Sequence, residues 1–274
     1  MASTEVATGL RNWLLRALPA YEFELLSPHL ELVKLDTGRV VSDVNTPIEY
    51  VYFPETGVIS SVSVMADGSA VETATIGPEA MAGIAVFHGV DSTQEHIFVQ
   101  VPGEGHRVAS ATFRSLLPSL PELTRLLHRC SVALFTLAGQ NSGCNRKHSV
   151  LRRCARWMLM THDRVERDRY ELTHHVLSQM LGVRRASVTE SAQALSEAGA
   201  IEYRRGMVRI LDRDALERAS CECYGIIRST FNRLLGDGTM ASPLDGIRLS
   251  RGGRSIAKDG TPQAEPTAIT VDPE

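Results

Sequence analysis

The sequence predicts an α+β protein with an N-terminal β-roll (jelly roll), a long dimerisation helix and a C-terminal winged helix-turn-helix. Three observations predict this order. Short β-rich runs fill residues 32–108, a heptad pattern of apolar residues begins at Pro121, and two short helical segments flank Gly182 ahead of a hairpin pattern. A chain of 274 residues is long enough to form two hydrophobic cores.

The β-roll is predicted from alternating apolar and polar residues. After a short helical start at residues 10–18, the clearest runs lie at 49–53, 58–64, 71–76 and 96–101. Turn residues recur every 8 to 15 positions, which favours an antiparallel barrel or roll. The dipeptide Asp67-Gly68 between two of these runs is typical of a hairpin.

The long helix is predicted from residues that recur at alternating intervals of four and three. They are Leu123, Leu127, Cys130, Leu134, Leu137, Asn141 and Cys144. This is the a/d seam of a coiled coil, and such a seam usually meets an identical helix. We therefore predict a homodimer whose interface holds Leu123, Leu127, Cys130, Leu134, Leu137 and Asn141, with Asn141 setting the register. The alternative is a helix packed only on its own barrel, because Ala133 and Phe135 widen the stripe.

A hinge is expected at residues 145–149, where the apolar pattern is interrupted. Ser149 is a suitable N-cap for a second helix from Val150 to about Asp163, and residues 163–171 have the composition of a solvated loop. The predicted domains are therefore a sensor roll at 1–120, the dimerisation helix at 121–147 and the winged helix-turn-helix at 148–236. Residues 237–274 are predicted to be a disordered tail, because they are rich in Gly, Ser, Pro, Asp and Arg.

The helix-turn-helix is predicted between Thr173 and Glu197. Thr173 caps a helix that runs to about Leu181, and its buried residues are Val176, Leu177 and Met180. Gly182 follows, where a tight turn needs left-handed backbone. A second helix runs from about Arg184 to Ala198, with Val188, Ala192 and Leu195 pointing inward.

A hairpin directly after the second helix makes the pattern more specific. Strand-like residues 199–204 and 207–211 are joined by Arg205-Gly206, so they form the wing of a winged helix-turn-helix. Two helices alone could equally be an ordinary helical hairpin, whereas helices and wing together are the geometry of a DNA-reading domain.

The distribution of charge agrees with DNA binding, although the net charge of the whole chain is -3. Residues 149–236 carry 15 basic and 11 acidic side chains, whereas residues 1–148 carry 10 basic and 15 acidic ones. The positive charge is thus concentrated in the part with the helix-turn-helix, where phosphate contacts would need it.

The chain resembles the Crp/Fnr family of bacterial transcription regulators over residues 10–235. The strongest block is residues 172–190, from Leu172 to Glu190. Residues 50–57 and Cys221-Glu222-Cys223-Tyr224 resemble a less-studied branch of the family, without evident cyclic-nucleotide or iron-sulfur motifs. The resemblance implies a cyclic-nucleotide-binding-like roll that receives a signal, and a dimer that binds a near-palindromic operator in double-stranded DNA and works with RNA polymerase.

The resemblance also implies roles for single residues. Arg185 matches the arginine with which family members read a guanine, and a guanidinium can bond both O6 and N7 of that base. The chain departs from the family at Ala186, where glutamate is common, and at Glu190, where many members carry arginine. The residues predicted to contact DNA are Thr173, Arg184, Arg185, Ser187, Thr189, Glu190, Arg204 and Arg205, with Arg209 as a further phosphate contact.

The roll offers a candidate effector pocket but no evident cofactor. Family members bind the ribose of a nucleotide with a Gly-Glu segment, which matches Gly77, Glu79, Met81 and Gly83 here. Residues 91–101, which would hold the cyclic phosphate, contain no arginine or lysine, so a buried phosphate would lack a cationic partner. Arg107 could supply one, although residues 103–107 are typical of an exposed turn. The effector therefore remains unidentified.

Metal and haem sites are also weakly indicated. Iron-sulfur relatives carry clustered cysteines near the N-terminus, whereas the first cysteine here is Cys130. On a helix the side chains of Cys221 and Cys223 would diverge, so the cysteines are interpreted as buried small residues and no metal ligand is predicted. The histidines in the sensor half leave haem binding open; they are His88, His96, His106, His128 and His148.

Two other classes of protein are alternatives to a regulator. A cupin-like metalloenzyme could use the same type of roll, but no His-x-His pair is present, and the winged helix would have no purpose. A protein-interaction module is the second alternative, and salt-dependent DNA binding would separate it from a regulator. We expect no enzymatic activity. The odd number of cysteines and the absence of a signal-like or membrane-spanning run predict a cytoplasmic protein with no membrane contact.

Overall fold

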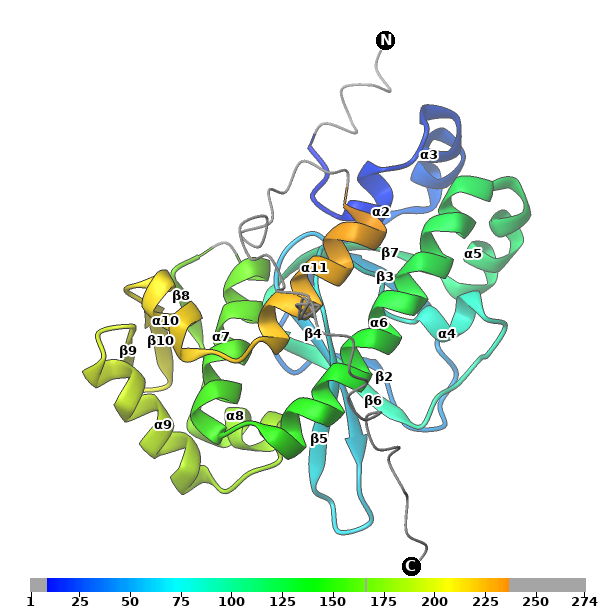
Figure 1. Ribbon diagram of the computed structural model, residues 1–274. Coiled ribbons are helices and arrows are strands. Elements are labelled where there is room, and N and C mark those ends of the chain that lie inside the picture. Colours follow the sequence, from blue (N-terminus) through cyan, green and yellow to red (C-terminus); the bar gives the residue numbers. More distant parts are fainter. Residues whose placement is uncertain (1–8, 166, 237–274) are drawn as a thin grey trace, which may run out of the picture. The chain divides into compact units, whose positions relative to one another are not determined.

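The computed structural model describes residues 9–165 and 167–236 of the chain. Its strands form three antiparallel sheets (Figure 1). One sheet has the order β1 (Glu31–Leu35), β7 (Gly103–Ala109), β3 (Tyr50–Pro54). Another has the order β2 (Val40–Ser42), β6 (Glu95–Val101), β4 (Val58–Val64), β5 (Ala70–Ile76). The third has the order β8 (Arg169–Glu171), β10 (Met207–Ile210), β9 (Ile201–Arg204).

The first two sheets form the predicted N-terminal roll. Their inner side chains, such as Val51, Phe53 and Ile59, are fully buried. Strands β4 and β5 pair with Val64 opposite Ala70, and Gly68 in the connecting turn has a φ of +80°. Glycine adopts this left-handed conformation without steric cost, so the hairpin predicted at Asp67-Gly68 is confirmed.

The described helices precede or follow the roll, apart from α4, which lies between β5 and β6. The helices are α2 (Trp13–Arg16), α3 (Ala20–Leu26), α4 (Ile84–Phe87), α5 (Ser110–Leu116), α6 (Pro121–Lys147), α7 (Val150–Val165), α8 (His174–Leu181), α9 (Arg185–Glu197), α10 (Arg213–Ala219) and α11 (Cys223–Leu235). The longest two are α6 and α7. Single 3-10 turns, η1 (Ser27–His29) and η2 (Leu117–Ser119), precede β1 and α6. The helical start predicted at residues 10–18 is shorter in the structure, because the Asn12 side chain accepts the N–H groups of Leu14 and Leu15 and so begins α2 at Trp13.

Helix α6 is stabilised at both ends. Proline at its first position costs no hydrogen bond there, because that N–H would have no helical partner. The buried carboxylate of Glu22 accepts the N–H groups of Glu122 (2.7 Å) and Leu123 (2.9 Å). Arg146 and Lys147 lie in the last turn, where positive charge favours the helix dipole.

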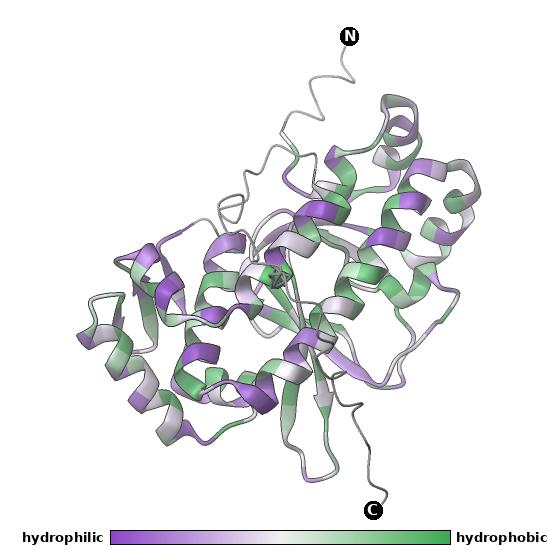
Figure 2. Cartoon of the chain, viewed as in Figure 1, coloured by the Kyte–Doolittle hydropathy of each residue, from purple (hydrophilic) through white to green (hydrophobic). Residues whose placement is uncertain are grey.

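The seam predicted to meet a second copy is instead buried within the chain. Leu123, Leu127, Cys130 and Leu137 are fully buried, Leu134 is half-buried, and α6 packs on α11, α2 and β5. Asn141 accepts a hydrogen bond from Arg156 and donates one to the carbonyl of Thr73 (2.9 Å). The ribbon of α6 carries both hydrophobic and hydrophilic segments (Figure 2). Phe135 of this helix is 81% exposed. The heptad pattern therefore marks the face that covers the chain's own core.

The segment between α7 and α8 also differs from the prediction. Helix α7 continues to Val165, and the expected loop contains β8, which pairs with β10 through Tyr170 and Val208. Tyr170 is buried and its hydroxyl donates to the carbonyl of Met158 (3.1 Å), so this apolar residue holds the strand against α7. The wing is therefore a three-stranded sheet.

The predicted tail at residues 237–274 lies outside the described residues. In the part of the chain that the structure describes, no helix is both long enough and apolar enough to cross a membrane.

Candidate nucleic-acid interface

Helix α8 begins and ends at the two residues that the sequence indicated. The Thr173 hydroxyl accepts the N–H of Val176 at 3.2 Å, which caps the first turn. Gly182 ends the helix with a φ of +61°, and its N–H returns to the carbonyl of Gln179 at 3.1 Å. The chain can therefore turn sharply into α9, as a helix-turn-helix requires.

Helix α9 is amphipathic, and the residues that the sequence predicted to point inward are the buried ones. Val188, Ala192 and Leu195 are buried, and α9 packs on both α7 and α8. Arg185, Ala186, Thr189, Glu190 and Gln193 are exposed. A helix with this division can lie in the major groove with its exposed residues on base edges.

His174 joins α8, α9 and the wing, a role that sequence reasoning missed. Its Nδ1 lies 2.9 Å from the Thr189 hydroxyl, and its ring centroid lies 4.4 Å from that of Tyr203 in β9. The Thr189 hydroxyl donates to the carbonyl of Arg185 at 3.1 Å, so the ring N–H of His174 donates to Thr189. Burial, and then the positive charge of Arg185, lower the pKa of His174, which favours this neutral ring.

The wing carries positive charge on neighbouring strands. Its turn consists of Arg205 and Gly206, both with positive φ (+49° and +77°), which is the geometry of a type I′ hairpin turn. Arg169 and Arg209 are direct cross-strand partners and both are exposed. Arg209 also lies opposite Glu202 of β9, so the wing holds one repulsive and one attractive cross-strand pair. Three arginines and Glu202 line a hollow of about 220 Å³; the arginines are Arg169, Arg204 and Arg209.

The residues predicted to contact DNA lie on this part of the molecule. Arg184 is the N-cap of α9 and Arg185 is its first residue, and both are exposed. Ser187 is half-buried, Glu190 is exposed one turn further on, and Arg204 and Arg205 lie at the tip of the wing. Glu202 reaches Arg204 at 3.4 Å, although both side chains are largely exposed. The roles of these residues in binding remain predictions.

The four residues predicted for an effector pocket do not surround a common space. Met81 is fully buried, Gly83 has a φ of +86° and begins α4, and Glu79 is paired with Arg164 of α7 at 2.6 Å. A Cβ on Gly77 would lie 2.5 Å from Arg164, so the backbone passes directly over that side chain. The segment is therefore packed against α7.

Arg107, considered as a phosphate partner, is also held elsewhere. The predicted turn at 103–107 is part of strand β7. The Arg107 guanidinium donates to Glu31 at 2.8 Å and lies 4.2 Å from the Tyr50 ring centroid.

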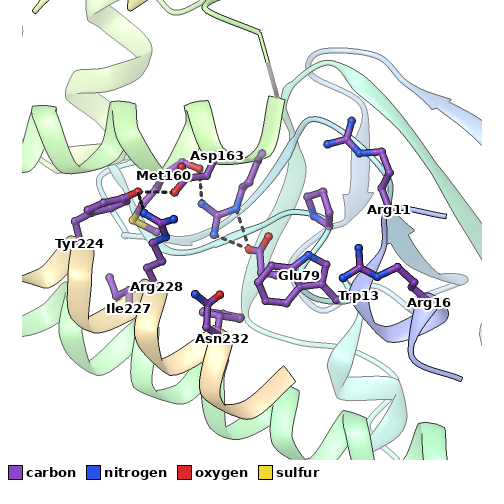
Figure 3. A pocket seen from close by; sticks show the side chains of 13 residues that line it. Arg11, Trp13, Arg16, Glu79, Met160, Asp163, Tyr224, Ile227, Arg228 and Asn232 are labelled. Carbon is purple, nitrogen blue, oxygen red and sulfur yellow. Dashed lines mark hydrogen bonds and ion pairs between the residues drawn. The ribbon is translucent and has the colours of Figure 1, made fainter. Parts of the chain in front are cut away.

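A larger pocket of about 310 Å³ lies beside the Glu79–Arg164 pair (Figure 3). Its walls come from α2, the segment around Pro78, α7 and α11. Asp163 and Tyr224 face it, joined by a hydrogen bond of 2.9 Å. Of the four predicted pocket residues, only Glu79 is among those that line it.

The cysteines differ from the prediction in one respect. All five are buried and free, as expected of small core residues. The side chains of Cys221 and Cys223 do not diverge, however, because Cys221 precedes α11 and Cys223 is its first residue. Both converge with Cys144 and His148.

Comparison with known proteins supports the fold and identifies one domain. Residues 152–219 match the family model of the Crp-like helix-turn-helix domain. No curated protein matches the chain. A putative Crp/Fnr transcriptional regulator from Eubacterium rectale superposes with a TM-score of 0.58 at 15% identity, covering 75% of this chain and 96% of that one.

Two further solved structures share the fold. FixK2 from Bradyrhizobium japonicum has a TM-score of 0.59 at 15% identity and covers 70% of this chain and 98% of its own. The c-di-GMP responsive regulator CLP from Xanthomonas campestris has a TM-score of 0.57 at 15% identity, and the match covers 70% of this chain and 99% of that one. The α+β fold and the resemblance to Crp/Fnr regulators that the sequence predicted are thereby confirmed.

Proposed function

We propose that this Crp/Fnr-type chain, with its Crp-like helix-turn-helix domain, is a homodimeric transcription regulator that binds a specific sequence in double-stranded DNA. One observation carries the proposal: the exposed Arg185 begins α9, and α9 packs on β9 of a wing that bears Arg204, Arg205 and Arg209. A base-reading arginine and phosphate-binding arginines are thus presented together.

Recognition of the operator rests on the exposed residues of α9. Arg185 reads a guanine through O6 and N7, and Glu190 accepts a hydrogen bond from a cytosine amino group. Ala186 offers only a methyl group, which suits contact with thymine. Arg184, Arg204 and Arg205 bind phosphates, and Thr173 and Ser187 add hydroxyl contacts. This set differs from the family pattern at two positions, so the operator differs too.

The dimer is proposed to form through the exposed side of α6. Val132 is 54% exposed and Phe135 is 81% exposed. Gly139 and Gly143 follow on the same side, and a Cβ at either would meet no other atom within 4 Å. An exposed apolar strip ending in glycines allows a second helix to approach closely, and it continues the 3.5-residue period (132, 135, 139) of a coiled coil. Two copies would place their α9 helices in successive major grooves about 34 Å apart.

The signal is proposed to act at the pocket beside Glu79 and Arg164. This pocket is lined by the roll, through Pro78 and Glu79, by α7, which packs on α8 and α9, and by α11, which packs on α7. A small molecule bound there would therefore shift the balance between arrangements of α7 and the roll. We assign no chemical identity to this effector. RNA polymerase as a further partner rests on the resemblance alone.

The test is recovery of bound genomic fragments by the purified full-length chain, followed by fluorescence anisotropy on the recovered sequence. We expect specific binding at least about 10³-fold tighter than binding to random DNA at the same salt concentration, and affinity that falls steeply with salt. Failure to retard any DNA even at low salt would overturn the proposal and leave a protein-interaction module. Retardation of all sequences equally would remove the claim of specificity.

A further inference from the structure

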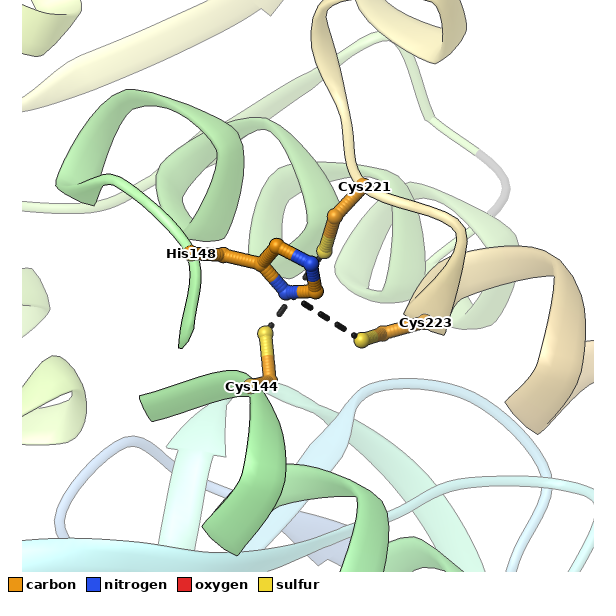
Figure 4. Close-up of side chains that lie close together, drawn as sticks. All are labelled: Cys144, His148, Cys221 and Cys223. Atoms are coloured by element: carbon orange, nitrogen blue, oxygen red, sulfur yellow. Dashed lines mark hydrogen bonds between the residues drawn. The ribbon is translucent and has the colours of Figure 1, made fainter. Parts of the chain in front are cut away.

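Four potential metal ligands meet at two chain junctions far apart in the sequence (Figure 4). Cys144 lies in the last turn of α6, and His148 follows that helix. Cys221 lies in the link between α10 and α11, and Cys223 begins α11. Their three sulfur atoms and one imidazole nitrogen all lie within 4.8 Å of one another.

Local geometry explains why each pair converges. Cys144 and His148 are four residues apart at a helix end, so they lie on the same side of α6. Cys221 and Cys223 are separated by a bend, because Glu222 is the N-cap of α11 and the helix starts only at Cys223. The packing of α11 on α6 then brings the two pairs together.

The distances agree with a tetrahedral zinc ion. The sulfur atoms of Cys144 and Cys221 are 3.6 Å apart, and Cys223 Sγ lies 3.5 Å from His148 Nδ1. With Zn–S bonds of about 2.3 Å and Zn–N bonds of about 2.0–2.1 Å, a tetrahedron has S–S edges of about 3.8 Å and S–N edges of about 3.6 Å. Both observed distances are within about 0.2 Å of those edges.

The surroundings of the four groups match those of a metal site. His148 presents Nδ1 to the sulfurs, and its Nε2 lies 3.1 Å from the carboxylate of Glu222. Ligating histidines usually donate their second ring N–H to such a carboxylate, which orients the ring. The amide of Gln140 donates to Cys223 Sγ at 3.0 Å, which stabilises a thiolate.

A disulfide and an iron-sulfur cluster fit these atoms less well. Bonded sulfurs are about 2.05 Å apart, whereas the sulfurs of Cys144 and Cys221 are 3.6 Å apart. A disulfide between them would also not explain why Cys223 and His148 lie beside them. The cysteines of a four-iron cluster each bind a different iron, whereas the four ligand atoms here all lie within 4.8 Å of one another, close enough to share one ion. Three thiolates and one imidazole are ligands typical of zinc.

We propose that Cys144, His148, Cys221 and Cys223 bind one Zn²⁺ ion, which fastens the start of α11 to the junction between α6 and α7. With four protein ligands the coordination sphere is complete, so the ion is structural and not catalytic. This inference goes beyond the proposed function and does not depend on DNA binding. It replaces the interpretation of these cysteines as small core residues.

The test is the metal content of the full-length chain, loaded with equimolar ZnSO4 under reducing conditions and then desalted. We expect about one zinc ion per chain by mass spectrometry of the elements. The double variant Cys221→Ser/Cys223→Ser should lose zinc at least tenfold. The matched control, Cys130→Ser/Cys154→Ser, changes two buried cysteines outside the cluster and should keep one ion.

Three further measurements keep the test decisive if a serine variant fails to fold. Co²⁺ added to the wild-type chain should produce the visible absorption of a tetrahedral thiolate site. His148→Cys keeps four ligands and should still hold one zinc ion, whereas Glu222→Gln should weaken zinc binding about 10- to 100-fold. Wild-type protein without zinc after loading, or zinc retained by the Cys221→Ser/Cys223→Ser variant, would each overturn the proposal.

Discussion

Arg164 of α7 donates two hydrogen bonds to the carboxylate of Glu79, at 2.6 Å and 2.9 Å, and both side chains are more than nine-tenths buried. The guanidinium also donates to the carbonyl of Met160 at 2.6 Å. This pair fastens the helix that supports the DNA-binding elements to the segment of the roll where the sequence predicted an effector contact.

Breaking this ion pair should destabilise the chain. Glu79→Ala leaves Arg164 charged and buried, and we expect a loss of about 3–5 kcal/mol in the free energy of unfolding. Glu79→Leu combined with Arg164→Met removes both charges and should recover most of that loss. Urea denaturation of the three proteins measures both values. A double variant no more stable than Glu79→Ala would contradict this explanation.

Glu72 should make stability depend on pH. Its buried carboxylate accepts hydrogen bonds from Ser60 (2.6 Å) and Trp157 (2.7 Å), and burial raises its pKa from 4.5 to about 7. The folded state therefore holds a proton that the unfolded state has lost between about pH 4.5 and pH 7. The contribution of Glu72 to stability should be greatest below about pH 4.5. It should fall as pH rises to about 7, by about 3 kcal/mol in total.

Glu72→Gln isolates this contribution, because its amide does not titrate. Denaturant midpoints across pH 4.5–7.5 should fall more steeply for the wild-type chain than for the variant. Parallel curves for the two proteins would show that Glu72 keeps its charge in the folded state.

Arg185→Ala should weaken binding to the recovered operator by about 1–3 kcal/mol and relax the preference at one base pair. Its neighbour Arg184, also exposed, provides the matched control. Arg184→Ala should weaken binding to all sequences alike and reduce the salt slope by about one. Competition with operators changed at single positions measures both effects. An equal loss on every sequence for Arg185→Ala would make it a phosphate contact.

Arg209→Gln should weaken DNA binding while changing the stability of the fold by less than about 1 kcal/mol. Arg209 lies directly opposite Arg169 on one side and Glu202 on the other, so the substitution removes one repulsive and one attractive cross-strand pair, each worth roughly 0.2–1 kcal/mol. DNA affinity should fall and the salt slope should decrease by about one. Unfolding curves and anisotropy titrations at several salt concentrations test this. Unchanged DNA affinity would exclude the wing strand from the interface.

Phe135→Glu should dissociate the proposed dimer, because it places a charge at the most exposed apolar position of α6. Leu211→Glu is the matched control, since Leu211 is also exposed (53%) but follows β10. Sedimentation velocity should give a monomer for the first variant and a dimer for the second. Dimers from both would place the interface on another surface.

The local elements of the DNA-binding domain could be predicted from the sequence alone. Thr173, Gly182 and the Arg205-Gly206 turn each answer a backbone requirement of adjacent residues, namely a cap for a helix N–H or a positive φ. Such requirements act within a few positions and therefore appear as short motifs. The bounds of α6 and the hairpin at Gly68 could be predicted for the same reason, because they too depend on neighbouring residues.

Only the tertiary structure decided which groups meet. Periodicity identified the apolar face of α6 but not the neighbour that covers it, and that neighbour is the chain's own roll together with α11. Glu79 meets Arg164, 85 positions away, and Cys144 meets Cys221, 77 positions away. No local spacing records such contacts, because they arise when separate elements bury their apolar faces against each other. The sequence by itself thus determined helices α6 to α9 and the turns of a Crp-like helix-turn-helix domain, whereas packing decided the buried ion pair, the free face of α6 and the convergence of four potential metal ligands.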